Sequence, residues 1–190
     1  MRKKLRAARQ IGIDLDPRVI RAWRQGNQSE LCELVEIDCV NWLRESNLEP
    51  SALIYADPPY LPSTRRRARV YRYDYQESHH VQLLEMLRTQ PCRVMISGYR
   101  SSLYSILLRG WEERSFQVAT HVGLREETVW FNFTLPEVLH DTRHLGNGFR
   151  EREAIRRRRR RLESRIMRLS SQERHSLYGW LGHQIKDASP

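Results

Sequence analysis

The tetrapeptide Asp57-Pro58-Pro59-Tyr60 follows an apolar run at residues 52–56 and carries the residue types best suited to chemistry. Proline fixes φ and has no N–H, and the residue before a proline is held extended. The Asp57 carboxylate and the Pro58 carbonyl are therefore expected to be rigid acceptors, with the Tyr60 ring beside them. Two fixed acceptors and a stacking ring are suited to gripping an exocyclic amino group on a planar base.

Two further aspartates, Asp14 and Asp38, close the two preceding predicted strands. In open α/β sheets ligands bind beyond the carboxyl ends of the strands, and an acid there commonly binds ribose hydroxyls. Asp14 suits that role, and Asp38 is suited to accept from an adenine amino group. The alternative is that each acid caps the following helix, as Asp16 is expected to do before Pro17. The recurrence at Asp14, Asp38 and Asp57 favours a nucleoside cofactor site.

Alternating strands and helices are expected to position these residues. Apolar runs predict strands at residues 11–15, 34–38, 52–56 and 92–97. Helical spacing predicts helices from Pro17 onward and at residues 40–45, 77–89 and 101–109. Residues 116–122 and 128–133 are expected to form an antiparallel pair at a sheet edge. This order indicates an α/β fold with a parallel, doubly wound, Rossmann-like sheet.

The composition changes after Pro136. Residues 1–136 are predicted to form the catalytic domain, and residues 137–190 a linker and an arginine-rich helical tail. Helices are expected at residues 151–169 and, more briefly, at 172–185. Residues 61–75 show no clear period, which predicts a long loop or an irregular hairpin.

The charge balance indicates a polyanionic partner. The chain of 190 residues has a formal net charge of +10, and 29% of its residues are charged. Nucleic acid is the first interpretation and an anionic membrane surface the second. The chain has no apolar run of membrane-spanning length and no secretory signal. Its three cysteines lack metal-ligand spacing, which indicates free thiols in a reducing cytoplasm.

Two basic segments are candidates for nucleic-acid contact. The first follows the tetrapeptide directly and comprises Arg65, Arg66, Arg67, Arg69 and Tyr71. The second is a run on the tail helix, Arg156, Arg157, Arg158, Arg159, Arg160 and Arg161. Six like charges in a row repel one another, so this run is expected to be solvated, and disordered without a polyanion. It would bind phosphates without sequence specificity.

Five blocks in order resemble the DNA adenine methylase (Dam-like) family over residues 7–135. They are residues 11–17, 35–38, 54–60, 94–99 and 127–133, of which the Asp-Pro-Pro-Tyr block is the specific one. The resemblance implies an S-adenosylmethionine-dependent methyltransferase that acts on adenine N6 in double-stranded DNA, in a modification system of the restriction-modification or phage type. By this resemblance Asp14 would bind the cofactor ribose, Asp38 its adenine, and Asp57, Pro58, Pro59 and Tyr60 the target base.

The chain departs from the family pattern at its start. Family members begin with a lysine-containing block and a Phe/Gly-rich turn that cradles the methionine part of the cofactor, whereas ten residues precede Ile11 here. In the family this block supplies a strand between those that carry Asp14 and Asp57. We therefore expect two internal strand edges to be unpaired. The chain would then be a truncated gene product, the product of a wrongly assigned start, or a protein with a second polypeptide as a partner that supplies the strand and the glycine-rich loop.

Alternative functions follow from the same residues. A non-catalytic DNA-binding remnant would keep the arginines and the base pocket without holding the cofactor. Serine in place of Asp57 is usual in cytosine N4 enzymes and asparagine in protein-glutamine enzymes, so Asp57 favours adenine. RNA stays open as a substrate. His79 and His80 have no metal-ligand partners in sequence, and Ser97 lacks the setting of an esterase nucleophile.

Overall fold

The structure is a computed structural model. It describes residues 7–26, 32–65, 72–120, 123–136, 145–146 and 148–187. The chain divides into two units, Met1–Leu135 and Pro136–Pro190. The assignment of the first unit as a catalytic domain stays a prediction.

A two-stranded parallel sheet opens the first unit. Strand β1 (Ile11–Asp14) pairs with β2 (Glu33–Glu36), and helix α1 (Pro17–Gln25) connects them. Asp16 caps α1 by accepting a hydrogen bond from the Arg18 N–H at 2.8 Å, and Pro17 occupies the first turn. The predicted strand, cap and helix start are confirmed.

A four-stranded mixed sheet has the order β3-β4-β6-β5. Its strands are β3 (Leu53–Ala56), β4 (Arg93–Gly98), β5 (Glu112–Thr120) and β6 (Gly123–Phe131). The β3–β4 pair is parallel, and β6 runs antiparallel to both β4 and β5. The antiparallel edge pair was predicted, but both strands begin earlier than their apolar stretches. A mixed α/β architecture is the result.

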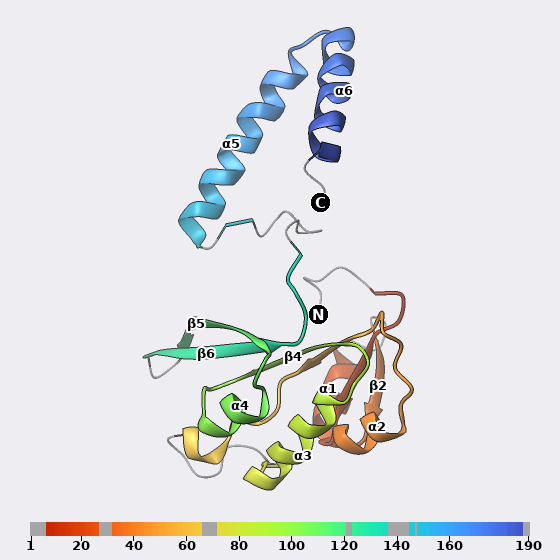
Figure 1. Ribbon diagram of the computed structural model, residues 1–190, viewed down its shortest axis with the longest axis vertical. Coiled ribbons are helices and arrows are strands. Elements are labelled where there is room, and N and C mark those ends of the chain that lie inside the picture. Colours follow the sequence, from red (N-terminus) through yellow and green to blue (C-terminus); the bar gives the residue numbers. More distant parts are fainter. Residues whose placement is uncertain are drawn as a thin grey trace. The chain divides into compact units, whose positions relative to one another are not determined.

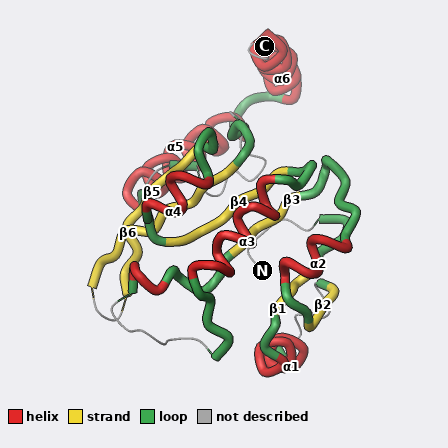
Figure 2. Tube along the Cα trace, turned by 60° about the horizontal axis from the view of Figure 1, so that its bottom comes forward, coloured by secondary structure: helices red, strands yellow, loops and turns green. Residues whose placement is uncertain are grey.

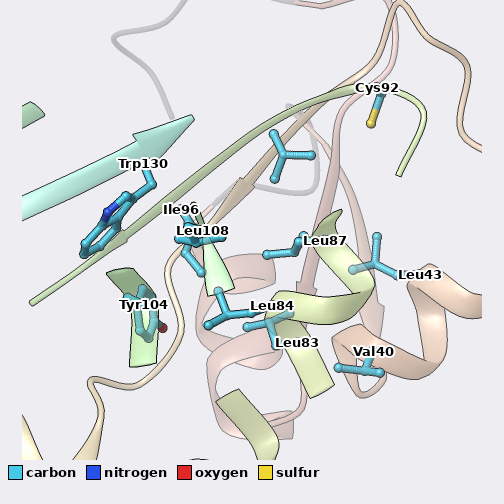
Figure 3. Packing of buried hydrophobic residues seen from close by; sticks show 11 residues of the cluster. Val40, Leu43, Leu83, Leu84, Leu87, Cys92, Ile96, Tyr104, Leu108 and Trp130 are labelled. Atoms are coloured by element: carbon cyan, nitrogen blue, oxygen red, sulfur yellow. The ribbon is translucent and has the colours of Figure 1, made fainter. Parts of the chain in front are cut away.

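Three helices cover one face of this sheet (Figure 1). They are α2 (Cys39–Glu45), α3 (Glu77–Arg88) and α4 (Ser102–Leu107), with α3 packed against both others. In Figure 3 the leucines of α3, Leu83, Leu84 and Leu87, lie among the buried residues of the core. Val94, Ile96 and Trp130 from the sheet complete that core and are at most 2% exposed. The core thus fixes β3 and β4, the strands that carry the tetrapeptide and Ser97.

The two sheets are separate, as Figure 2 shows by two groups of yellow strands. Among the described residues, β1 pairs with β2 alone and β3 with β4 alone. The predicted break between the strands that carry Asp14 and Asp57 is therefore present. Leu53 and Tyr55, on the face of β3 away from Ile54 and Ala56, are 58% and 50% exposed. Parallel sheets are usually covered on both faces and paired at internal edges, so this half of the sheet is open by comparison.

The second unit contains two helices, α5 (Phe149–Met167) and α6 (Ser171–Asp187). The arginine run is exposed and lies within α5, which agrees with the helix predicted at residues 151–169. Its behaviour without a polyanion stays a prediction. Two ion pairs within the helix offset its charge repulsion, Arg156–Glu153 at 2.7 Å and Arg159–Glu163 at 2.6 Å. The described helices include none that is both long and apolar enough to cross a membrane.

Candidate active site

Asp57 lies exposed at the carboxyl end of β3 and is held there by Ser97 of β4. The Ser97 hydroxyl donates to Asp57 Oδ1 at 2.9 Å, and the Tyr55 and Ser97 hydroxyl oxygens lie 3.2 Å apart. The described residues donate no hydrogen bond to Asp57 Oδ2 or to the Pro58 carbonyl. These two acceptors therefore have no donor among the described residues, and their role toward a substrate N–H stays a prediction. Sequence reasoning did not predict the hydrogen bond from Ser97.

The Tyr60 side chain is fixed by residues far away in sequence. Its hydroxyl donates to Glu127 Oε1 of β6 at 2.7 Å. Its ring centroid lies 4.2 Å from that of Tyr99, with the planes tilted by 32°. Burial and the bond to Glu127 raise the pKa of the Tyr60 phenol well above its usual range, so it stays a neutral donor. Glu127 belongs to the 127–133 block, but its bond to Tyr60 was not predicted.

The Arg65 side chain is buried, at 4% exposure, and forms a two-pronged ion pair with Asp74. Nη1 lies 2.6 Å from Oδ2, and Nη2 lies 2.6 Å from Oδ1. Its Nε donates to the Tyr60 carbonyl oxygen. Arg65 was predicted to contact phosphate, but a buried and paired guanidinium has no surface to offer a phosphate. We therefore reassign Arg65 to holding the tetrapeptide in place.

Asp14 and Asp38 follow the two strands of the small sheet at its carboxyl edge. Asp14 Oδ1 accepts from the Asp16 N–H at 2.7 Å. Asp38 Oδ1 caps α2 by accepting from the N–H groups of Val40 and Asn41, both at 3.0 Å. One oxygen of Asp38 therefore caps a helix, which was the alternative to cofactor binding in the sequence analysis. The roles of both aspartates toward a cofactor stay predictions.

Residues 72–75 link the carboxyl ends of β1, β2 and β3. Arg72 Nη1 lies 3.8 Å from Asp16 Oδ1, which follows β1. The Tyr75 hydroxyl lies 3.2 Å from the Cys39 thiol, which follows Asp38. Asp74 binds Arg65 beyond the tetrapeptide. Residues 72–75 thus contact residues that follow β1 and β2 and, through Arg65, the Tyr60 carbonyl of the tetrapeptide.

The described residues suit the nucleoside part of S-adenosylmethionine better than its methionine part. Asp14 and Asp38 each engage backbone N–H groups through Oδ1, and the described residues give neither Oδ2 a partner. A pocket of about 290 Å³ lies instead at the opposite end of β1, lined by residues that include Ile11, Trp42 and Leu48. No glycine-rich turn and no strand between β1 and β3 occur in the described chain to bind a methionine group. The fit is therefore partial.

Several predicted contact residues, Arg66, Arg67, Arg69 and Tyr71, lie outside the described residues. The structure places the run Arg156–Arg161 on α5, in the second unit. His79 Nδ1 accepts from the Gln76 N–H, whereas His80 is buried. Within the described ranges no group of three potential ligands gathers to bind a metal ion.

Comparisons with known proteins add a distant resemblance of fold. Neither the protein-family models nor the curated proteins match the chain. Among solved structures, the chain is similar to one described as "delta-N METTL16 MTase domain", with 11% sequence identity and a TM-score of 0.37. The match covers 65% of this chain and 63% of that one, so this chain spans less than two thirds of the length of that structure.

Proposed function

We propose that this chain is a DNA methyltransferase that transfers a methyl group from S-adenosylmethionine to adenine N6. The observation that carries the proposal is the exposed Asp57 carboxylate at the end of β3, followed along the chain by the Pro58 carbonyl and by the Tyr60 ring, which Glu127 and Tyr99 hold. An adenine amino group has two N–H donors to match two acceptors. The ring supplies a stacking surface for a base that has left the duplex.

The residues of the site would act on the target amine as follows. N6–H groups donate to Asp57 Oδ2 and to the Pro58 carbonyl, which directs the nitrogen lone pair away from both acceptors. When bound, S-adenosylmethionine supplies a methyl group on a sulfonium sulfur; the N–C bond forms as the S–C bond breaks. Positive charge that develops on N6 is stabilised by the fixed acceptors. The surplus proton then leaves N6 for the Asp57 carboxylate or for solvent.

Replacement of Asp57 by asparagine is expected to lower the rate of methylation by about 10²-fold, because a neutral amide stabilises the developing charge less. The measurement is N6-methyladenine by mass spectrometry after incubation of the chain with S-adenosylmethionine and unmethylated duplex DNA. Glu126→Gln, at an exposed position of β6, is the matched control. Product formed equally by Asp57→Asn would contradict the assignment.

A second candidate is a DNA-binding chain that requires another polypeptide to complete its cofactor site. Strands β1 and β3 each have one edge that pairs with no other described strand. These edges favour the second candidate, since an added parallel strand would pair with both. Calorimetry with S-adenosylmethionine separates the two. Cofactor binding by the chain alone supports an enzyme that needs no second polypeptide. DNA binding without cofactor binding supports a chain that another polypeptide completes, or a non-catalytic remnant.

The α5 arginines are expected to contribute to the salt dependence of DNA binding. Six consecutive residues at 3.6 per turn surround the helix, so about half can face one row of phosphates. Four of these arginines form no ion pair among the described residues: Arg157, Arg158, Arg160 and Arg161. Replacing these four by glutamine should reduce the slope of log K against log salt by about 2. The charge-matched control replaces Arg18, Arg21, Arg24 and Arg44, which are exposed on α1 and α2. Equal slopes in both variants would contradict a role for α5.

A further inference from the structure

Tyr60 is held both at its side chain and at its backbone. The hydroxyl donates to Glu127, and the carbonyl oxygen accepts from Arg65. Arg65 is itself fixed by Asp74 at 13% side-chain exposure. A side chain held at both ends loses little further freedom when it binds a base, which favours binding.

One face of the Tyr60 ring is already covered. Tyr99 stacks against it at 4.2 Å, and the Arg125 guanidinium lies 5.4 Å from the Tyr99 ring centroid. Arg125 Nη1 also donates to the Tyr99 hydroxyl at 3.3 Å. Arg125 and Glu127 stand two residues apart on β6 and so share one face of the strand. One strand thus holds both rings of the stack.

We propose that Glu127 is a positioning residue that sets the Tyr60 ring for the target base, which stacks on the ring face away from Tyr99. The inference rests on the proposed function, because it takes an extruded base as the ligand. Glu127 acts through the Tyr60 hydroxyl and does not touch the base. Loss of its acceptor frees the ring to rotate, so the stacking surface is no longer in place when the base arrives.

The test compares two duplexes that differ in the cost of extruding one adenine. An unpaired or mismatched base leaves the stack more easily, so a protein with a base pocket prefers a duplex with a central A·C mismatch over the A·T duplex. The ratio of the two dissociation constants, measured by fluorescence anisotropy with labelled duplexes, reports base binding. Contacts to phosphates affect both duplexes alike and cancel in the ratio.

Glu127→Ala is expected to reduce the mismatch preference by about three- to tenfold, because it weakens binding of the readily extruded base more than it weakens binding of the paired duplex. Tyr60→Phe removes the same hydrogen bond and should have the same effect, and the double variant should be no worse than either single one. Glu127→Gln retains an acceptor oxygen and should restore most of the preference. Glu126→Ala, on the neighbouring exposed residue of β6, should have no effect.

The possible outcomes separate the two proposals. A mismatch preference that survives in Glu127→Ala would overturn the positioning role and leave the proposed function standing. Additive effects of Glu127→Ala and Tyr60→Phe would also overturn it, because they would show that the two residues act independently. Absence of any mismatch preference in the unaltered chain would overturn base extrusion itself, and the positioning role with it.

Discussion

Replacement of Asp74 by alanine is expected to lower the free energy of unfolding by about 3–5 kcal/mol, because it leaves the Arg65 guanidinium buried without its counter-charge. The Arg65 side chain is 4% exposed and makes both prongs of the pair with Asp74. Urea denaturation of the variant and of the unaltered chain measures the difference. A fall of this size would account for a large part of the stability of a small domain.

The exposed pair of Arg9 and Glu33 is the matched control for this prediction. Its N···O distance is 2.8 Å, but the side chains are 73% and 52% exposed. Glu33→Ala should therefore change the free energy of unfolding by less than about 1 kcal/mol. Similar losses for Glu33→Ala and Asp74→Ala would contradict the argument from burial.

A double variant, Arg65→Met with Asp74→Ala, tests whether the unpaired buried charge causes the loss of stability. It removes both charges and fills part of the space with an apolar side chain, so it should be more stable than Asp74→Ala alone. The Tyr60 carbonyl nevertheless loses the Arg65 donor in this variant. We expect stability to recover while the mismatch preference does not, which separates the stabilising role of the pair from its role at the site.

The strands and helices of the first unit were largely predictable because each apolar run has a local cause. Asp16 and Pro17 fix the start of α1, and the apolar spacing within residues 77–89 fixes α3. The start of β5 was missed because Glu112, Glu113 and Arg114 look like a polar loop. These residues become a strand by pairing with β6, where Glu113 also accepts from Trp130 Nε1 at 3.1 Å. Pairing across strands leaves no mark in local composition.

At the candidate site, too, local sequence predicted the residues whose behaviour has a local cause and missed the contacts between distant residues. Asp57 and its prolines were identifiable because proline restricts the backbone wherever it occurs. Arg65 could not be distinguished from Arg66 and Arg67 in the sequence, since its pairing with Asp74, nine residues later, leaves no local mark. Glu127 lies 67 residues from Tyr60, and no periodicity could connect them. What sequence reasoning misses here are contacts made across the chain.

His80 is expected to make the protein lose stability as the pH falls below neutral. The residue is fully buried, and Nδ1 lies 3.0 Å from the Tyr104 hydroxyl. Burial, and then the positive charge of Arg65, lower the pKa of His80 from 6.5 to about 4, with Asp74 acting in the opposite sense. The described residues give Nε2 no hydrogen-bond partner, so a proton there would be poorly solvated.

The direction of the pH effect follows from which state binds the proton. In the unfolded chain His80 takes up a proton as the pH falls through 6.5, whereas in the folded chain it resists until about pH 4. The contribution of neutral His80 to stability is therefore complete above pH 6.5 and is lost progressively between pH 6.5 and 4. The difference between the two pKa values corresponds to about 3 kcal/mol.

The measurement is urea denaturation at a series of pH values for the unaltered chain and for His80→Gln, which retains a hydrogen-bonding group for Tyr104 but does not titrate. Between pH 7 and 4 the unaltered chain should lose about 3 kcal/mol more than this variant. His79→Gln removes the neighbouring exposed ring, whose charge lowers the pKa of His80 less than burial does, and should retain most of the pH dependence. Parallel profiles for the unaltered chain and His80→Gln would show that burial does not hold His80 neutral. Because the charge of Arg65 helps to lower the pKa of His80, Arg65→Met should also make stability depend less steeply on pH. This result would show that the Arg65–Asp74 ion pair affects the titration of His80.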